Sequence, residues 1–154
     1  MALEPYIRPE LTFVLDGVES KSKLFELMAQ AVDELVEALD GETLQRRLEA
    51  REEQMATSTP EGVAFPHALA PEIDKTFILA ARLKSGVDFG VPDHPKSDLI
   101  FCMFGSSKDP WEHIRLLARL ARIVRSDEAR SKLRGASDAA DLYQRLLAED
   151  RSHG

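Results

Sequence analysis

The chain has 154 residues, of which 44% are hydrophobic and 31% charged, and its formal net charge at pH 7 is −7. This length is typical of one domain with a sizeable core, and the composition is that of a globular protein rather than a disordered or fibrous one. We therefore expect a single domain over residues 1–154. The negative charge argues against nucleic acid as a partner, because proteins that bind the phosphate backbone normally carry a basic face.

No apolar run approaches the ~18 residues that a membrane span needs. The first residues, MALEPYIRPEL, also lack the basic and apolar regions of a signal peptide. We therefore expect a cytoplasmic protein with no stable membrane insertion. The single cysteine, Cys102, cannot form an intramolecular disulfide, and its apolar surroundings are typical of a thiol in the core.

The N-terminal part predicts one strand and two helices. LTFVL, Leu11–Leu15, is rich in β-forming residues and precedes the turn-like pair Asp16-Gly17. Apolar residues then recur every three or four positions over Lys21–Leu39, which predicts a helix that Asp40-Gly41 ends. A shorter, more charged helix is expected over Glu42–Gln54. Its inward side chains are expected to be Leu44, Leu48 and Met55.

Three β-rich stretches follow, separated by loops. Short buried strands are predicted over Val63–Phe65, Thr76–Leu83 and Leu99–Gly105. Ala68–Lys75 and Lys84–Gly86 are expected to form turns. The segment GVDFGVPDHPKSD, Gly86–Asp98, contains two prolines and two glycines, which predicts a short edge strand and then a loop around Pro92 to Lys96.

Three helices are expected in the C-terminal part. Asp109 can cap the first of them and Pro110 suits its first turn. Ser126-Asp127 opens a short helix that ends near Gly135, and Ser137-Asp138 opens the last one. The inward stripe of the first helix is predicted to be Ile114, Leu117, Leu120, Ala121 and Val124. This alternation predicts an α/β fold, a mixed β-sheet flanked by helices on both faces.

His67 is the first candidate functional residue. It lies in the segment GVAFPHA, Gly62–Ala68, in which Pro66 removes a backbone donor and holds Phe65 in the extended region. We therefore expect the strand to end there and the histidine to be displayed at its rim, where functional side chains are common. The alternative is a surface or hydrogen-bonded histidine with no chemical task.

His113 is the second candidate, because it lies in the first turn of the helix that Asp109 opens. A helix N-terminus favours anions such as phosphate, and a histidine there could donate to the same anion. The alternative is a partly exposed first-turn residue without a function.

The chain resembles the type-2 IIA domains of the bacterial phosphoenolpyruvate-dependent phosphotransferase system, the fructose, mannitol and nitrogen-regulatory group. GVAFPHA resembles the active-site segment of that family, and His67 falls on the histidine that is phosphorylated there. REEQMATSTPEG resembles the stretch that places Arg51 beside the phosphate, and WEHIRLLARLARIV resembles the helix with the second active-site histidine, here His113. SDAADLYQRLLAED resembles the terminal helix of the family.

Two departures from the family pattern affect the loop and the strand around His67. The family usually has glycine after the active histidine and a glycine-rich loop before it, whereas this chain has Ala68 and STPEG. Glu61 matches an acidic position of the mannitol-like members and is a candidate phosphate-site neighbour, with a solvated loop carboxylate as the alternative.

The resemblance implies phosphoryl transfer between histidines, with His67 as nucleophile, His113 and Arg51 as donors to the phosphoryl group, and no metal or cofactor. It implies an HPr-like carrier as donor, and a IIB domain or a regulatory protein as acceptor. The absence of a membrane or IIB segment from these residues favours the regulatory role. The alternative is a binding module that works without phosphate.

Two further readings come from the residues alone. A metal site built from His67, His94, His113 and Cys102 is disfavoured, because the chain has no closely spaced ligand pair. A basic face is predicted on the helix after Asp109, either solvated or turned to an acidic partner. Its members are Arg115, Arg119, Arg122 and Arg125.

Overall fold

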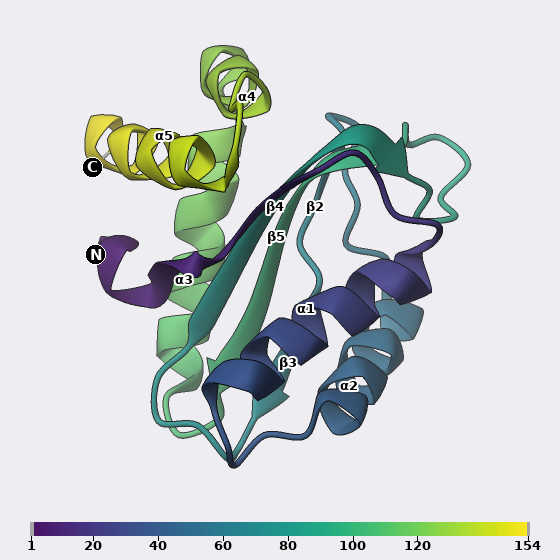
Figure 1. The fold of residues 1–154 in the computed structure, drawn as a ribbon, viewed down its shortest axis with the longest axis vertical. Helices are drawn as coiled ribbons and strands as arrows, with labels where there is room; N and C mark the ends of the chain where they lie inside the picture. The colour runs from purple at the N-terminus through teal and green to yellow at the C-terminus, as the bar shows by residue number, and fades with distance from the viewer. Residues whose placement is uncertain (1, 154) are drawn as a thin grey trace.

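The computed structural model describes residues 2–153 and places a five-stranded sheet between two groups of helices (Figure 1). The elements in chain order are η1 (Glu4–Tyr6), β1 (Ile7–Leu15), α1 (Lys21–Leu35), α2 (Gly41–Gln54), β2 (Val63–Ala64), β3 (His67–Ala70), β4 (Phe77–Val87), β5 (Ser97–Ser106), α3 (Pro110–Val124), α4 (Asp127–Arg134) and α5 (Ala139–Ser152). Within the described residues no helix is both long and apolar enough to cross a bilayer.

The sheet has the strand order β1-β4-β5-β2, and β3 also pairs with β5. β4 and β5 are antiparallel, whereas β1 runs parallel to β4, and β2 and β3 run parallel to β5. α1 and α2 lie on one face, and α3, α4 and α5 lie on the other (Figure 1). The prediction of a mixed sheet with helices on both faces is therefore confirmed.

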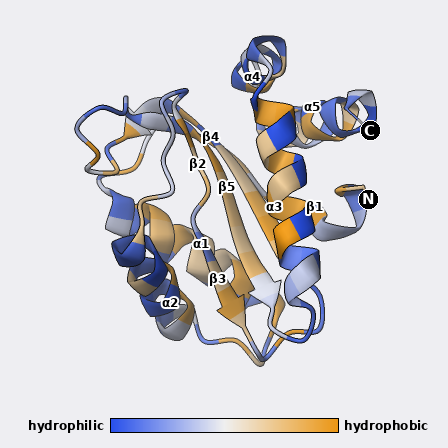
Figure 2. Cartoon of the chain, turned by 180° about the vertical axis from the view of Figure 1, so that it is seen from behind, coloured by the Kyte–Doolittle hydropathy of each residue, from blue (hydrophilic) through white to orange (hydrophobic). Residues whose placement is uncertain are grey.

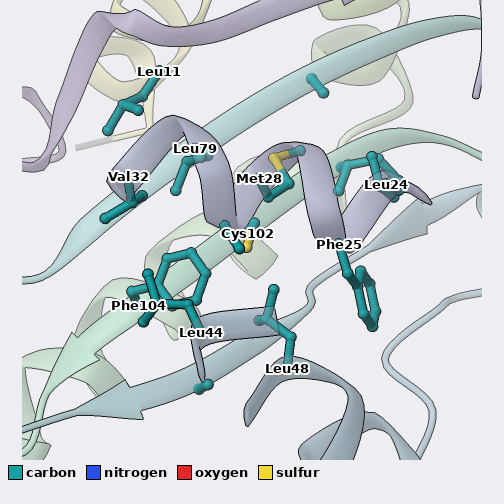
Figure 3. Packing of buried hydrophobic residues seen from close by; sticks show 14 of the residues in the cluster. Leu11, Leu24, Phe25, Met28, Val32, Leu44, Leu48, Leu79, Cys102 and Phe104 are labelled. Carbon is teal, nitrogen blue, oxygen red and sulfur yellow. The ribbon is translucent and has the colours of Figure 1, made fainter. Parts of the chain in front are cut away.

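Each face of the sheet has its own hydrophobic core, because successive side chains of a strand point to opposite faces. On β4, Leu79 and Ala81 pack in the cluster with α1 and α2, while Ile78 and Ala80 pack in the cluster with α3, α4 and α5. Figure 3 shows Cys102 among the leucines and phenylalanines of the first cluster, as its apolar context indicates. Figure 2 shows the same strands as predominantly hydrophobic.

The first predicted helix ends four residues early, at Leu35. Val36 leaves the helix with φ −127° and ψ 105°, and a turn joins its carbonyl to the N–H of Leu39. Leu39 is still buried, so its periodic spacing reflects burial rather than helix. The Asp33 carboxylate accepts the N–H of Gly41 at 3.1 Å, which closes this turn against α1. In α2, Leu44 and Leu48 are buried as predicted, but Met55 is exposed beyond the helix end.

Three predicted turns or short strands are wrong in the region of β3, β4 and β5. Lys84–Gly86 lies inside β4, where the ladder to β5 shifts register between Arg82 and Val87. A Cβ at Gly86 would lie 3.0 Å from Lys96 Cβ, so glycine here marks a bulge with close backbone approach and not a turn. Val87 ends β4 without a separate edge strand after it. The predicted turn after Pro66 instead begins with strand β3.

The buried face of α3 is rotated from the predicted stripe. Apart from His113, its buried residues are Leu116, Leu120, Ile123 and Val124. Ile114 is exposed and Ala121 points to solvent. Apolar residues cover more than half of this helix, so their spacing alone does not fix which side turns inward.

The last helix is tied to the N-terminal segment through Asp150. Its carboxylate accepts the N–H of Leu3 at 2.9 Å and Arg119 Nε at 2.6 Å, and Arg119 also donates to the Asp150 carbonyl at 2.6 Å. Asp150 is 3% exposed. α5, α3 and the start of the chain therefore share one buried charged group.

We expect Asp150→Ala to lower the free energy of unfolding by about 3 kcal/mol, because it leaves Arg119 buried without its counter-ion. Urea unfolding of the natural protein and the variant measures this difference in the free energy of unfolding. The control is Asp16→Ala, which breaks a pair with Lys84 on the surface and should cost less than about 1 kcal/mol. Equal effects of the two variants would contradict the structural role given to Asp150.

Candidate functional site

Three of the four predicted site residues line one cavity of about 490 Å³, between the end of α2, strand β3 and the start of α3. These three are His67, His113 and Arg51. Glu61 does not line it. The complete lining is Arg47, Ala50, Arg51, Gln54, His67, Ala68, Leu69, Pro110, His113 and Ile114.

His67 reaches this cavity as the first residue of an edge strand, not as the residue after the last strand residue. β2 pairs Ala64 with Ile100, and β3 pairs His67 with Met103, so the register with β5 continues across Pro66. The Pro66 carbonyl accepts the N–H of Met103 at 2.9 Å, so the missing proline donor interrupts the strand without releasing it. Because side chains alternate, His67 points to the sheet face that α3 covers.

The imidazole of His67 is held by its own chain. Nδ1 lies 2.8 Å from the carbonyl oxygen of Phe65. A carbonyl only accepts, so Nδ1 carries the proton and the neutral ring keeps its lone pair on Nε2. Burial lowers the pKa of His67, the Phe65 hydrogen bond raises it, and Arg51 lowers it again. A neutral ring with a free Nε2 is the nucleophilic form of histidine.

His113 packs beside His67, with ring centroids 5.2 Å apart and planes tilted by 51°. Only 8% of His113 is exposed, and its Nδ1 has no hydrogen-bond partner within residues 2–153. Burial, followed by the charges of His67 and Arg51, lowers the pKa of His113 to about 4. The ring lies against Gly105, where a Cβ would collide with it. Both histidines are therefore neutral at pH 7.

Glu112 fixes the turn of α3 that carries His113. Its carboxylate accepts Thr76 Oγ1 at 2.8 Å, the Thr76 N–H at 3.2 Å and Tyr6 Oη at 3.1 Å. The carboxylate of Asp109 caps the same turn through the Glu112 N–H. The position of His113 thus depends on contacts with η1 and with the residue before β4, which no local sequence pattern reveals.

The start of α3 is a weaker anion site than its sequence predicts. Pro110 has no N–H, and the N–H of Glu112 is already bonded to the negative Asp109 side chain. Positive charge at the cavity comes instead from α2. Among residues 2–153, Arg51 hydrogen-bonds only the Met55 carbonyl, at 3.3 Å. Arg47, one turn earlier, pairs with Glu72 at 2.7 Å. Sequence reasoning missed Arg47, although its i,i+4 spacing from Arg51 was the available signal.

The loop before β2 is held by Glu52, a buried carboxylate that accepts the N–H of Thr57 at 2.6 Å and its hydroxyl at 2.8 Å. Gly62, with φ +80°, supplies the left-handed residue that the loop needs. Ala68 does not need a left-handed backbone conformation. It lies within β3, and no non-glycine residue of the described chain has positive φ. Alanine after His67 is thus compatible with this geometry.

Glu61 lies in a different hollow. Its side chain is exposed and lines a shallow depression with Phe65 and with Val124 and Arg125 of α3, while its carbonyl accepts Arg134 Nη2 at 2.6 Å. The contact with Arg134 supports the loop. Glu61 therefore has no geometric support as a phosphate neighbour.

Of the four residues of the disfavoured metal site, His67 and His113 line the cavity, whereas His94 and Cys102 do not. His94 bonds Ser58 through Nδ1 at 2.8 Å, away from the cavity lining. Cys102 is fully buried in the core, and burial raises the pKa of its thiol.

The lowered pKa of His113 can be measured directly. In an NMR titration we expect its Cε1 proton to titrate near pH 4. Between pH 6.5 and 4 the unfolded chain binds a proton that the folded ring excludes, so the free energy of unfolding should fall as pH falls through this window. His113→Gln should reduce this slope, with His94→Gln as the control. A titration near pH 6.5 would contradict the proposed burial of the ring.

We expect Gly105→Ala to displace the His113 ring and to destabilise the fold by roughly 1–3 kcal/mol, since an added methyl overpacks this contact. Nuclear Overhauser effects between the two imidazoles should weaken. Gly17→Ala is the matched control, because a Cβ there meets only ordinary contacts at 3.5 Å. Unchanged ring contacts in Gly105→Ala would show that the ring does not depend on this glycine.

Comparison with solved structures shows which known proteins share this fold. The chain superposes on the crystal structure of nitrogen regulatory protein IIA-Ntr from Neisseria meningitidis with a TM-score of 0.82, 24% identity and coverage of 94% of this chain and 98% of that one. It also matches the complex of enzyme IIA mannitol and phosphorylated enzyme IIB mannitol from Escherichia coli, with a TM-score of 0.72, 16% identity and coverage of 92% and 99%. At these identities the likeness concerns the fold.

Sequence comparison identifies the family. A curated relative, the nitrogen regulatory protein of Bradyrhizobium diazoefficiens, is 31% identical over 146 residues, which cover 95% of both chains. The family model of the phosphoenolpyruvate-dependent sugar phosphotransferase system, EIIA 2, matches residues 5–149. The chain therefore belongs to the EIIA type 2 family of the phosphoenolpyruvate-dependent sugar phosphotransferase system.

Proposed function

We propose that this chain carries a phosphoryl group on Nε2 of His67, accepting it from an HPr-like carrier and using it mainly as a regulatory signal. The observation that supports this most strongly is the 2.8 Å contact between His67 Nδ1 and the Phe65 carbonyl, which leaves Nε2 neutral and unprotonated. Family membership supports the phosphoryl-transfer class of reaction.

In the proposed step, the Nε2 lone pair of His67 attacks the phosphorus of a phosphohistidine on the carrier. The new P–N bond forms as the P–N bond of the donor breaks, and that electron pair returns to the donor imidazole. His67 keeps its Nδ1 proton and becomes more positive when the phosphoryl group is attached. The Phe65 carbonyl, already in contact with that proton, stabilises the charge.

Arg51 and His113 are the groups proposed to receive the phosphoryl oxygens. Arg51 has guanidinium donors beyond the single contact with Met55, and a guanidinium can bind two oxygens at once. His113 is neutral and buried, so an arriving dianion raises its pKa and favours a protonated, donating ring. The cavity places both beside His67 before any phosphate arrives, which reduces the reorganisation that transfer requires.

A regulatory use is supported by the relatives. The curated nitrogen regulatory protein aligns over 95% of both chains. A IIB domain remains a second candidate acceptor, supported by the solved complex of enzyme IIA mannitol with phosphorylated enzyme IIB mannitol. Both acceptors would use the same exposed apolar rim. Leu69 and Ile114, which line the cavity and are 45% and 54% exposed, form it. Trp111, 67% exposed, lies in the same turn of α3.

The test is intact-mass analysis after incubation with Enzyme I, an HPr-like carrier from the same organism and phosphoenolpyruvate. We expect one acid-labile phosphoryl group on the natural protein, none on His67→Ala, and one on the control His94→Ala. Arg51→Ala should slow the transfer by roughly 10²–10³-fold, the usual effect of removing one donor to a developing charge.

Absence of phosphate on the natural protein with matched carriers would reject the relay. It would favour the alternative function, a regulatory module that binds its partner through the same cavity without phosphate. Phosphate that persists in His67→Ala would place the acceptor elsewhere in the chain.

A further inference from the structure

A hollow of about 390 Å³ on α3 has an unusual lining for a chain with net charge −7. Four arginines and one alanine line it, and no acidic residue does. It shares no lining residue with the cavity of His67, so it is a separate feature of the surface. The lining residues of this arginine hollow are Arg115, Ala118, Arg119, Arg122 and Arg125.

Arg119 gives the hollow one guanidinium of fixed orientation. Its side chain is only 10% exposed, Nε donates to Asp150 Oδ1 at 2.6 Å, and Nη2 donates to the Asp150 carbonyl at 2.6 Å. Nη1 makes no hydrogen bond within residues 2–153 and remains in contact with solvent. Because the guanidinium is planar and two of its nitrogens are anchored, Nη1 is held in place as a donor for a ligand in the hollow.

The other three arginines have no anion of their own. Arg115, Arg122 and Arg125 are exposed and make no ion pair with a carboxylate of residues 2–153 at 4.0 Å or less. Like charges three or four residues apart on a helix repel one another. Cations stabilise a helix C-terminus, but this effect does not apply to Arg115 in the first half of α3. The carbonyls of Val124 and Arg125 also already accept Arg130 Nη1, at 2.6 and 3.1 Å.

This arrangement suits an anion whose charge is spread over several groups. A guanidinium matches phosphate oxygens with two parallel N–H donors. The ten residue steps from Arg115 to Arg125 correspond to about 15 Å along the helix at 1.5 Å per residue. A chain of linked phosphates can meet several of these guanidiniums in turn, whereas orthophosphate or a single carboxylate has its charge at one point.

We propose that the arginine hollow is a binding site for a short phosphate chain, such as that of a nucleoside triphosphate or of inorganic tripolyphosphate. Arg119 contacts one phosphate through Nη1, and Arg115, Arg122 and Arg125 bind the others. The bound phosphates remove the repulsion among the arginines. This inference does not depend on phosphoryl transfer to His67.

Nucleic acid also offers a chain of phosphates, but the molecule as a whole disfavours it. Tight binding to a nucleic acid backbone needs many phosphate contacts and a net basic surface, whereas this chain has a net charge of −7. A small ligand inside the hollow is affected less by the distant carboxylates, because the Debye length at 0.15 M salt is about 8 Å. The local arginines therefore dominate its binding.

The test is an NMR titration of the isotope-labelled protein with tripolyphosphate at an ionic strength of about 0.15 M, without divalent cations that would compete for the phosphates. One variant removes the exposed charges of the hollow and leaves Arg119 with its ion pair to Asp150. A control variant removes three exposed arginines outside α3, with the same change in net charge. The arginine-hollow variant carries Arg115→Gln, Arg122→Gln and Arg125→Gln. The control carries Arg8→Gln, Arg46→Gln and Arg151→Gln.

We expect saturable shifts of the α3 amides and of the Arg119 Nε–H signal in the natural protein. The dissociation constant should rise at least tenfold in the arginine-hollow variant and stay within about threefold in the control. Orthophosphate should bind at least tenfold more weakly than tripolyphosphate. ATP should shift the same signals. Tighter binding of ATP than of tripolyphosphate favours a nucleotide as the natural source, and weaker binding favours inorganic polyphosphate.

Four results would overturn the proposal. The first is the absence of shifts at millimolar tripolyphosphate, and the second is equal binding by the arginine-hollow variant, whose folding the same spectra report. The third is a set of shifts centred on β3 and the end of α2, which would place the ligand in the His67 cavity. The fourth is a short DNA duplex that binds more tightly than tripolyphosphate and is lost in the same variant, in favour of nucleic acid. Orthophosphate that binds as tightly as tripolyphosphate would contradict the recognition of a phosphate chain.

Discussion

The hydrogen bond between His67 Nδ1 and the carbonyl of Phe65 is the contact on which the proposed chemistry of this molecule depends. It joins residues two apart in sequence, and it forms because Pro66 interrupts the edge strand without shifting its register on β5. At this interruption the Phe65 carbonyl accepts a hydrogen bond from the His67 side chain. The side chain becomes a fixed tautomer on a rigid strand rather than a mobile ring on a loop.

The neutrality of the two imidazoles follows from packing. Burial is the largest cause of the lowered pKa at both His67 and His113, and the positive Arg51 acts in the same direction. The site thus keeps its positive charge on the guanidinium, which stays charged at all relevant pH values. In the proposed reaction, the group that lends a lone pair to phosphorus is thus kept neutral, and the group that binds the phosphoryl oxygens is kept charged. This division of roles explains why an arginine and two histidines, rather than three cations, surround the cavity.

Much of the fold was predictable from the sequence because its signals are local. The caps Asp109, Ser126 and Asp138 were all identified, as were the breaks after α2 and before β5. The errors arose where burial and local pattern diverge. Leu39 is buried in a turn, Gly86 sits in a bulge, and α3 is apolar over more than one side. In each case the outcome depends on which distant surface the segment meets.

The residues of the candidate site also fall into two groups, those that the sequence predicted and those that it could not predict. His67, His113 and Arg51 could be named because they lie in motifs that resemble a known family, and the structure places them around one cavity. Gly105, Glu112 and Glu52 could not be named. Their roles depend on contacts with residues that the chain brings near only after folding, such as Thr76, the residue before β4. Residues that do chemistry carry a sequence signal, whereas residues that position them are recognised from the packed structure.

Adjacent residues in the first turn of α3 anchor the helix, line the cavity and form its rim. Glu112 points inward and anchors the helix, His113 points into the cavity, and Ile114 points out to its rim. Because the three directions are about 100° apart on a helix, one turn can serve folding, the proposed chemistry and the proposed partner contact at once. A displacement of that turn would therefore alter all three. The proposed partner contact and the proposed phosphoryl transfer therefore depend on three adjacent residues, Glu112, His113 and Ile114.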